Sequence, residues 1–126
     1  GEVEHQPTIA YLTFSADGRF LAVGGVYGGL RVWDRAENRQ CMEVPGHSSR
    51  VFGLAFSADG RRLASTGSDC TLKLWDTQTG HEVLTLRTQL HEHSPLAFSP
   101  DGADLLSVNM NHELQISTTR GARLGP

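Results

Sequence analysis

A five-residue pattern recurs at a constant interval along the chain and restricts its fold more than any other feature. Phe14-Ser15-Ala16-Asp17-Gly18 returns at residues 56–60 and, with Pro in place of Ala, at residues 98–102, each time 42 residues further on. The tripeptide Val32-Trp33-Asp34 returns as Leu74-Trp75-Asp76 at the same spacing of 42 residues. A fixed period of this length is typical of repeat architectures, in which every repeat forms one supersecondary unit. The 126 residues are therefore expected to hold three copies of one unit.

The second repeat shows most clearly what this unit is. Its short apolar or alternating segments predict four strands, at residues 51–56, 62–66, 71–75 and 82–86. Residues 71–75 alternate apolar and polar side chains, as expected for a strand whose two faces have different surroundings. Turn-forming residues separate the strands, and no segment has helical periodicity long enough to compete. The unit is predicted to be a four-stranded antiparallel meander, and the fold class to be all-β.

Each repeat carries the same turn chemistry between its first two strands. Glycine supplies a positive φ, and an aspartate can accept hydrogen bonds from its own local backbone. Because these residues occupy identical repeat positions, we expect them to form turns rather than to act in catalysis. They are Asp17, Gly18, Asp59, Gly60, Asp101 and Gly102.

The period, the Gly46-His47 pair, the Ser-x-Asp-Gly turns and the Trp-Asp strand ends together resemble the WD-repeat β-propeller family. The resemblance covers nearly the whole chain and is fullest in residues 46–88. It implies a single propeller segment over residues 1–126, in which each repeat forms one four-stranded blade. The implied blades are residues 5–46, residues 47–88 and an incomplete third blade at 89–122 that lacks its fourth strand.

The resemblance also implies a hydrogen-bonded tetrad that ties one blade together. Carried onto this sequence, its members are His47, Ser65, Asp69 and Trp75, with Thr66 as an alternative to Ser65. The chemistry is sound, because a buried indole N–H needs an acceptor and a buried imidazole needs both nitrogens satisfied. The other repeats depart from this pattern. The first keeps His5 and Trp33 but has Val23 and Tyr27 at the Ser and Asp positions, and the third keeps Ser107 but has Gln89, Asn111 and Ser117 elsewhere.

Three other patterns in the sequence have the residue types of functional sites, but each has a simpler structural explanation. Ser65, His47 and Asp69 have the residue types of a hydrolytic triad, but a serine that faces a tryptophan inside a blade is not an exposed nucleophile. His91-Glu92-His93 lacks an evident third metal ligand, so we expect a solvated loop and no metal site. The glycines at 24–25 and 28–29 are not followed by the Lys-Ser/Thr of a phosphate-binding loop. Trp33 and Trp75 are expected to be core residues. No cofactor is expected.

Composition limits the partners. The formal net charge of −3, with 11 scattered basic residues, argues against a nucleic-acid footprint or an acidic membrane surface. No apolar run is long enough to span a membrane, and the first residues lack the features of a signal peptide. Cys41 and Cys70 show neither disulfide nor metal spacing, so we expect free thiols and a cytoplasmic location.

Three repeats do not close a ring, since propellers typically use about 4–8 blades. Strand counting predicts about eleven strands, because the chain begins near the end of a fourth strand and stops before the last one. Two interpretations stay open. The favoured one is a segment of a longer propeller, and the other is a homodimer in which two copies complete the ring.

The expected function is a non-catalytic interaction scaffold that binds partner proteins or peptides through its loop face. Loops on a rigid scaffold are where recognition concentrates. The candidate binding residues are Arg50, Phe52, Tyr27 and Cys70, beside Thr8, Gly28 and Ser49. One alternative is a sensor or docking region of a larger signalling protein, such as a kinase or an ATPase. Direct hydrolytic activity is the weakest alternative, because no convergent set of carboxylates, histidines or metal ligands is evident.

Overall fold

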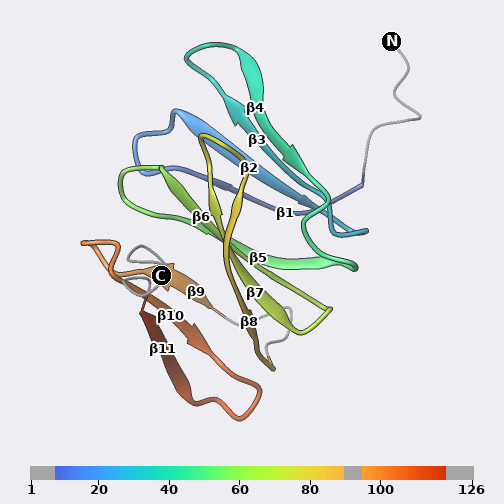
Figure 1. The fold of residues 1–126 in the computed structure, drawn as a ribbon, viewed down its shortest axis with the longest axis vertical. Coiled ribbons are helices and arrows are strands. Elements are labelled where there is room, and N and C mark those ends of the chain that lie inside the picture. The colour runs from blue at the N-terminus through green and yellow to red at the C-terminus, as the bar shows by residue number, and fades with distance from the viewer. Residues whose placement is uncertain (1–7, 90–94, 119–126) are drawn as a thin grey trace.

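A computed structural model describes residues 8–89 and 95–118 and confirms the all-β prediction (Figure 1). The described residues form eleven strands in three antiparallel sheets, each in sequence order. The first sheet contains β1 (Ile9–Phe14), β2 (Phe20–Gly25), β3 (Leu30–Asp34) and β4 (Arg39–Val44). The second contains β5 (Val51–Phe56), β6 (Arg62–Gly67), β7 (Thr71–Asp76) and β8 (Glu82–Arg87). The third contains β9 (Leu96–Phe98), β10 (Asp104–Val108) and β11 (Leu114–Thr118).

The four strands predicted for the second repeat begin at the residues where the structure begins them. Three of them extend one residue further, to Gly67, Asp76 and Arg87. The repeat also governs the irregularities of the sheets. A register shift occurs at the start of β1 and, 42 residues later, at the start of β5, and another recurs between β3–β4 and β7–β8. Bulges that recur at equivalent positions show that the repeats share backbone geometry and not only composition.

The Ser-x-Asp-Gly turns are built alike in all three sheets. In the second, Ser57 Oγ donates to Asp59 Oδ1 at 2.8 Å, and the backbone N–H groups of Arg61 and Arg62 donate to Asp59 Oδ1 and Ser57 Oγ at 3.0 Å each. Gly60 follows with φ of +73°. The turns at Ser15–Arg19 and Ser99–Ala103 repeat this pattern, with serine–aspartate distances of 2.7 Å. The same local polar groups therefore close each first hairpin.

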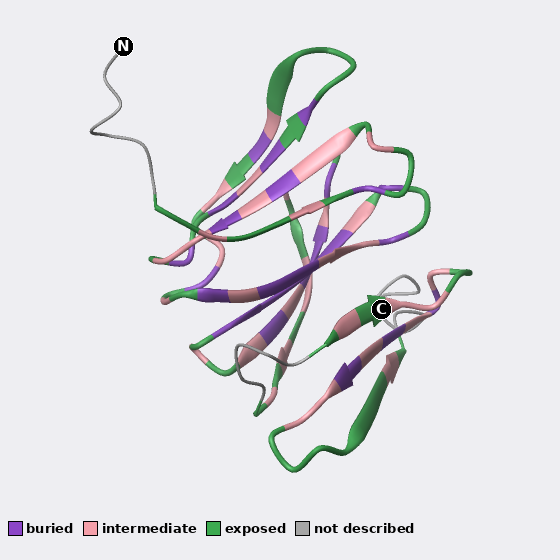
Figure 2. Ribbon diagram, turned by 180° about the vertical axis from the view of Figure 1, so that it is seen from behind, coloured by how far each residue is buried: buried purple, intermediate pink, exposed green. Residues whose placement is uncertain are grey.

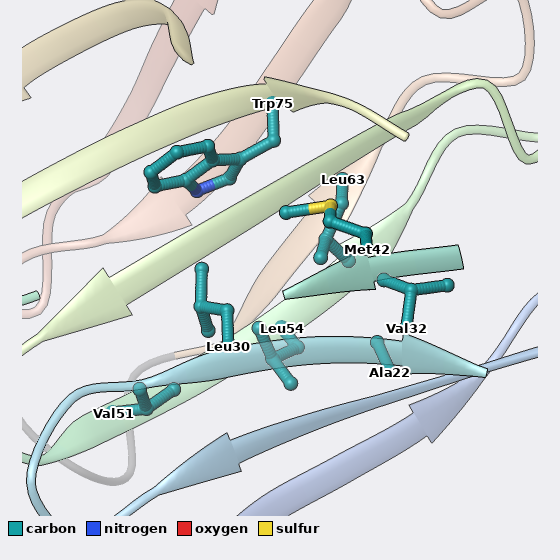
Figure 3. Packing of buried hydrophobic residues seen from close by; sticks show 8 residues of the cluster. All are labelled: Ala22, Leu30, Val32, Met42, Val51, Leu54, Leu63 and Trp75. Atoms are coloured by element: carbon teal, nitrogen blue, oxygen red, sulfur yellow. The ribbon is translucent and has the colours of Figure 1, made fainter. Parts of the chain in front are cut away.

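The core lies between successive sheets rather than inside any one of them. Ala22, Leu30, Val32 and Met42 of the first sheet pack against Val51, Leu54, Leu63 and Trp75 of the second (Figure 3). The opposite face of the second sheet packs on the third through Ala64, Leu72, Leu74 and Leu105. Each fully buried aliphatic side chain stabilises the fold by roughly 1.5–3 kcal/mol relative to an exposed one. The second sheet is covered on both faces, and buried residues concentrate in it (Figure 2).

The expectation that Trp33 is a core residue is wrong. Its side chain is 39 % exposed, whereas its repeat equivalent Trp75 is 4 % exposed. The physical reason is position along the array, because Trp75 faces the first sheet while Trp33 lies on the face of the first sheet that no described residue covers. Leu12 on the first sheet and Leu114 and Ile116 on the third are exposed for the same reason. Of the described part of the chain, no helix is long and apolar enough to cross a membrane.

Candidate functional site

The structure brings His47, Ser65, Asp69 and Trp75 together in one hydrogen-bonded chain. The indole Nε1 of Trp75 donates to Ser65 Oγ at 2.9 Å, and Ser65 Oγ lies 2.7 Å from His47 Nε2. On the other side of the ring, His47 Nδ1 lies 3.0 Å from Asp69 Oδ1. The alternative to Ser65 is not used, because Thr66 points to the other face of β6 beside Gly53. These hydrogen bonds thus connect the loop before β5 to strands β6 and β7.

One arrangement of protons satisfies every member of this chain. If the neutral His47 ring carries its proton on Nδ1, it donates to the Asp69 carboxylate, and Nε2 accepts from the Ser65 hydroxyl. The Ser65 oxygen is then free to accept the Trp75 N–H. His47 and Ser65 are buried, and no buried side-chain polar atom among the described residues lacks a partner. The geometry is that of a satisfied buried network.

The electrostatics favour this neutral imidazole beside an ionised carboxylate. Burial lowers the pKa of His47, although the adjacent Asp69 opposes the shift. Burial alone would raise the pKa of Asp69, but hydrogen bonds from Thr71, His47 and the Ser48 backbone lower it to about 2. Asp69 therefore keeps its charge and fixes the tautomer of the ring it faces.

Two further residues of this network were missed by the sequence analysis. Thr71 Oγ1 donates to Asp69 Oδ1 at 2.7 Å and lies 2.9 Å from His47 Nδ1. Gly67 passes so close to the ring that a Cβ atom there would lie 2.7 Å from His47 Nδ1. The spacing of Thr71, two residues after a turn aspartate, is a signal that could have identified it. Nothing local in the sequence indicates the close approach of Gly67.

The same geometry is unsuited to hydrolysis. A serine nucleophile must be open to substrate beside an oxyanion hole. Ser65 is 0 % exposed, and its hydroxyl lies between an imidazole and an indole. The three triad-type residues act here as a structural lock.

The incomplete tetrads are distributed as follows. His5 lies outside the described residues. Val23 is half-buried and Tyr27 is 84 % exposed, so neither repeats the bonds made by Ser65 and Asp69. In the third repeat Ser107 is buried, whereas Gln89 and Asn111 are exposed and Ser117 is half-buried. Of the repeats, only the second shows the complete chain of bonds within the described residues.

The lock positions the loop that follows His47 against the first sheet. The backbone N–H of His47 donates to the Gly28 carbonyl at 2.9 Å. Gly28 has φ of +99°, and a Cβ atom there would lie 2.0 Å from the His47 carbonyl oxygen. Glycine is required at this position both for its backbone conformation and for its lack of a side chain. The β2–β3 turn, with Tyr27 at its tip, is therefore held against the loop of residues 47–50.

The candidate partner-binding residues lie around this contact. Arg50 is exposed, and its carbonyl accepts the Ser68 N–H at 2.8 Å, which joins the loop to the β6–β7 turn. Cys70, exposed and at φ of +65°, belongs to that turn. Tyr27 is the most exposed large hydrophobic residue of the set, whereas Phe52 is half-buried. We call Tyr27, Arg50, Phe52 and Cys70 the loop face.

The described residues also bear on the requirements of a metal site and of a disulfide. Within residues 8–89 and 95–118, no group of three or more His, Cys, Asp or Glu side chains is placed to hold a metal ion. The segment His91-Glu92-His93 lies outside the described residues. Cys41 and Cys70 are free cysteines, and burial raises the pKa of the Cys41 thiol.

Comparison with solved structures shows the same architecture in larger molecules. The β-propeller domain of Cps50 (Swd1) from Myceliophteria thermophila matches 93 % of this chain with a TM-score of 0.77 and 22 % identity, over 38 % of its own length. The WD40 repeats of RRP9 match 92 % with a TM-score of 0.80 and 24 % identity, over 37 %. A chain of a mitotic checkpoint complex matches 94 % with a TM-score of 0.78 and 26 % identity, over 36 %. The protein thus spans well under half the length of these chains. No curated protein sequence matches it.

The family model described as "WD domain, G-beta repeat" matches residues 3–34 and 38–76. These segments contain the lock of the second repeat and most of the first two sheets. The three sheets are accordingly blades of a WD40-type β-propeller. Since the model matches more than half of the sequence, the protein belongs to the WD40 repeat family.

Proposed function

We propose that this protein is a non-catalytic interaction scaffold whose loop face binds a partner protein or peptide. The observation that supports this proposal most is a link between two sheets. The loop bearing Arg50 and the turn bearing Tyr27 come from different sheets, yet a backbone hydrogen bond joins them. His47 N–H donates to the Gly28 carbonyl, and Ser68 N–H donates to the Arg50 carbonyl. A rigid frame that presents exposed Tyr and Arg side chains suits recognition, because these residue types dominate binding hot spots.

Similarity to known assemblies supports the same proposal. One matched chain belongs to a mitotic checkpoint complex, so a chain of this fold is a component of a protein complex there. The buried Ser65 leaves the triad-type residues without a nucleophile, which favours binding over chemistry. The chemistry of a larger parent protein would then reside outside this segment.

The test is partner capture with matched variants. The intact protein is used to capture binding proteins, and the Tyr27→Ala/Arg50→Ala variant is compared with Arg39→Ala, an exposed arginine at the opposite end of the strands. Loss of the captured proteins only in the loop-face variant is expected. Equal capture by all three would refute the assignment of the loop face.

We further propose that additional blades cover the free faces of the first and third sheets. The exposed Trp33, Leu12, Leu114 and Ile116 are the repeat equivalents of residues that are buried between sheets elsewhere in the chain. The blades belong either to a longer polypeptide or to a second copy. Light scattering after size exclusion separates the two, because a stable monomer of 13.7 kDa contradicts the second copy.

A further inference from the structure

A polar cleft of ≈ 390 Å³ lies between the turns of the second and third sheets. It opens beside the β5–β6 and β7–β8 turns, at the end of the strands opposite the loop face, so it is distinct from the surface proposed above. The side chains that matter at this cleft are those of Asp59, Arg61, Arg62, Asp76 and Gln78, and Gly102 lies across from them.

The cleft exists because one aromatic residue of the first repeat is not kept in the second. Between the first and second sheets, Phe20 packs so closely that a Cβ atom on Gly60 would lie 3.4 Å from its ring. The equivalent of Phe20 is Arg62, and the equivalent of Gly60 is Gly102. A Cβ atom on Gly102 would have no atom of the described residues within 4 Å. The space that Phe20 fills between one pair of sheets stays open between the next pair.

An aspartate at this cleft lacks the guanidinium that its repeat equivalent holds. In the first sheet, Arg19 Nε and Nη2 donate to the two oxygens of Asp34 at 3.0 and 2.9 Å. In the second, the equivalent Arg61 instead donates to Gln78 Oε1 at 3.1 Å. Position 36 of the first sheet is alanine, so it offers Arg19 no such acceptor.

Among the described residues, Asp76 therefore makes only local bonds. Its Oδ1 accepts the backbone N–H groups of Gln78 and Thr79 at 2.8 and 3.2 Å. The carboxylate is half-buried and lines the open cleft. Asp34 shows that a carboxylate in this backbone setting accepts a bidentate guanidinium while keeping the same local bonds.

We propose that the cleft binds the guanidinium of an arginine side chain from a partner peptide, seated on Asp76 as Arg19 is seated on Asp34. Arginine suits this site better than lysine, because its planar fork matches a carboxylate with two parallel hydrogen bonds. The carboxylates of Asp59 and Asp76 line the cleft together with the guanidinium groups of Arg61 and Arg62. Because these two guanidinium groups oppose a further cation, an isolated arginine should bind weakly, with Kd on the order of 1 mM.

The test is a titration of the 15N-labelled protein with the peptide Ac-Gly-Arg-Gly-NH2, followed by NMR. Saturable shifts are expected at the amides of residues 57–62 and 76–79. The matched peptide with neutral citrulline in place of arginine, and the lysine peptide, should bind at least ~10-fold more weakly, since a charge-assisted bidentate pair is lost. Equal shifts with the arginine and citrulline peptides would overturn the proposal.

Two variants locate the site. Asp76→Asn keeps an oxygen for the Gln78 and Thr79 N–H groups but loses the charge, and should weaken binding of the arginine peptide at least ~10-fold. Arg62→Phe should fill the cleft as Phe20 fills its equivalent, with the same loss. Asp17→Asn, a turn aspartate of the first repeat, is the control and should leave binding unchanged. Undiminished binding by both Asp76→Asn and Arg62→Phe would show that the peptide binds elsewhere.

Discussion

The hydroxyl of Ser65 accepts the indole N–H of Trp75 at 2.9 Å and at the same time lies 2.7 Å from Nε2 of His47. One side-chain oxygen thus connects two neighbouring strands to the loop that precedes them. That loop carries Arg50 and is bonded to the Gly28 carbonyl of the preceding sheet. The stability of the second blade and the placement of the loop face therefore depend on the same atom.

Removing this hydroxyl should destabilise the protein strongly. Ser65→Ala leaves the Trp75 N–H and His47 Nε2 buried without partners, at roughly 1–3 kcal/mol each. Urea unfolding should show a loss of about 2–6 kcal/mol. Ser107→Ala is the control, because Ser107 occupies the equivalent buried position in the third repeat, where the tryptophan and histidine are absent. Similar losses in both variants would contradict the role of the lock.

Stability should fall as the pH is lowered below about 6.5, the ordinary pKa of histidine. Burial lowers the pKa of His47 in the folded state, so the unfolded chain binds a proton first. Proton binding therefore stabilises the unfolded state relative to the folded state as the pH falls. Urea unfolding between pH 8 and pH 5 measures this loss. An NMR titration of the His47 ring should give a folded-state pKa below 6.5. A folded-state pKa at or above 6.5 would contradict the assignment.

Two glycines with positive φ should respond differently to alanine. At Gly28 a Cβ atom would lie 2.0 Å from the His47 carbonyl oxygen, whereas a Cβ atom at Gly102 would have no atom of the described part of the chain within 4 Å. Gly102→Ala should therefore cost only the backbone strain of about 1–2 kcal/mol. Gly28→Ala should cost clearly more, because the contact between two blades must also move. Comparison of the two unfolding midpoints provides the measurement, and equal midpoints would refute the close approach.

The first and second sheets should be coupled through Gly24 and Val51. A Cβ atom on Gly24 would lie 2.5 Å from Val51 Cγ1. Gly24→Ala should destabilise the protein by about 1–3 kcal/mol through overpacking. Val51→Ala removes the two methyl groups but keeps a Cβ atom 2.7 Å from that position, so it relieves part of the overlap. The double variant should therefore lose less than the sum of the two single variants. Strict additivity in this double-mutant cycle would show that the two sheets do not pack as described.

The two tryptophans should differ in accessibility. Trp33 is 39 % exposed and Trp75 is 4 % exposed. Acrylamide should quench the fluorescence of the Trp75→Phe variant, in which Trp33 remains, more strongly than that of the Trp33→Phe variant, in which Trp75 remains. Equal, weak quenching in both would mean that the free face of the first sheet is covered, and light scattering would then show whether a second copy covers it.

Much of the fold could be predicted from the sequence, because the same local signals recur in each repeat and support one another. A single Asp-Gly turn is weak evidence, but three at one spacing fix where each hairpin closes. Strands β5 to β8 were placed to within one residue for this reason. Thr71 and Gly67 were missed because their roles depend on the position of the His47 ring, which lies about twenty residues away in the sequence.

The sequence by itself determined the period, the all-β class and the turn residues, since each of these follows from local chemistry repeated in register. The four candidate members of the lock were implied by the resemblance to the WD-repeat family. Only the tertiary structure decided which faces of the sheets are covered. Trp33 and Trp75 occupy equivalent repeat positions, each followed by an aspartate, yet one is exposed and the other buried, because burial depends on the neighbouring sheet. It also decided that Asp34 holds an arginine and Asp76 does not, since one glutamine two residues away diverts the guanidinium.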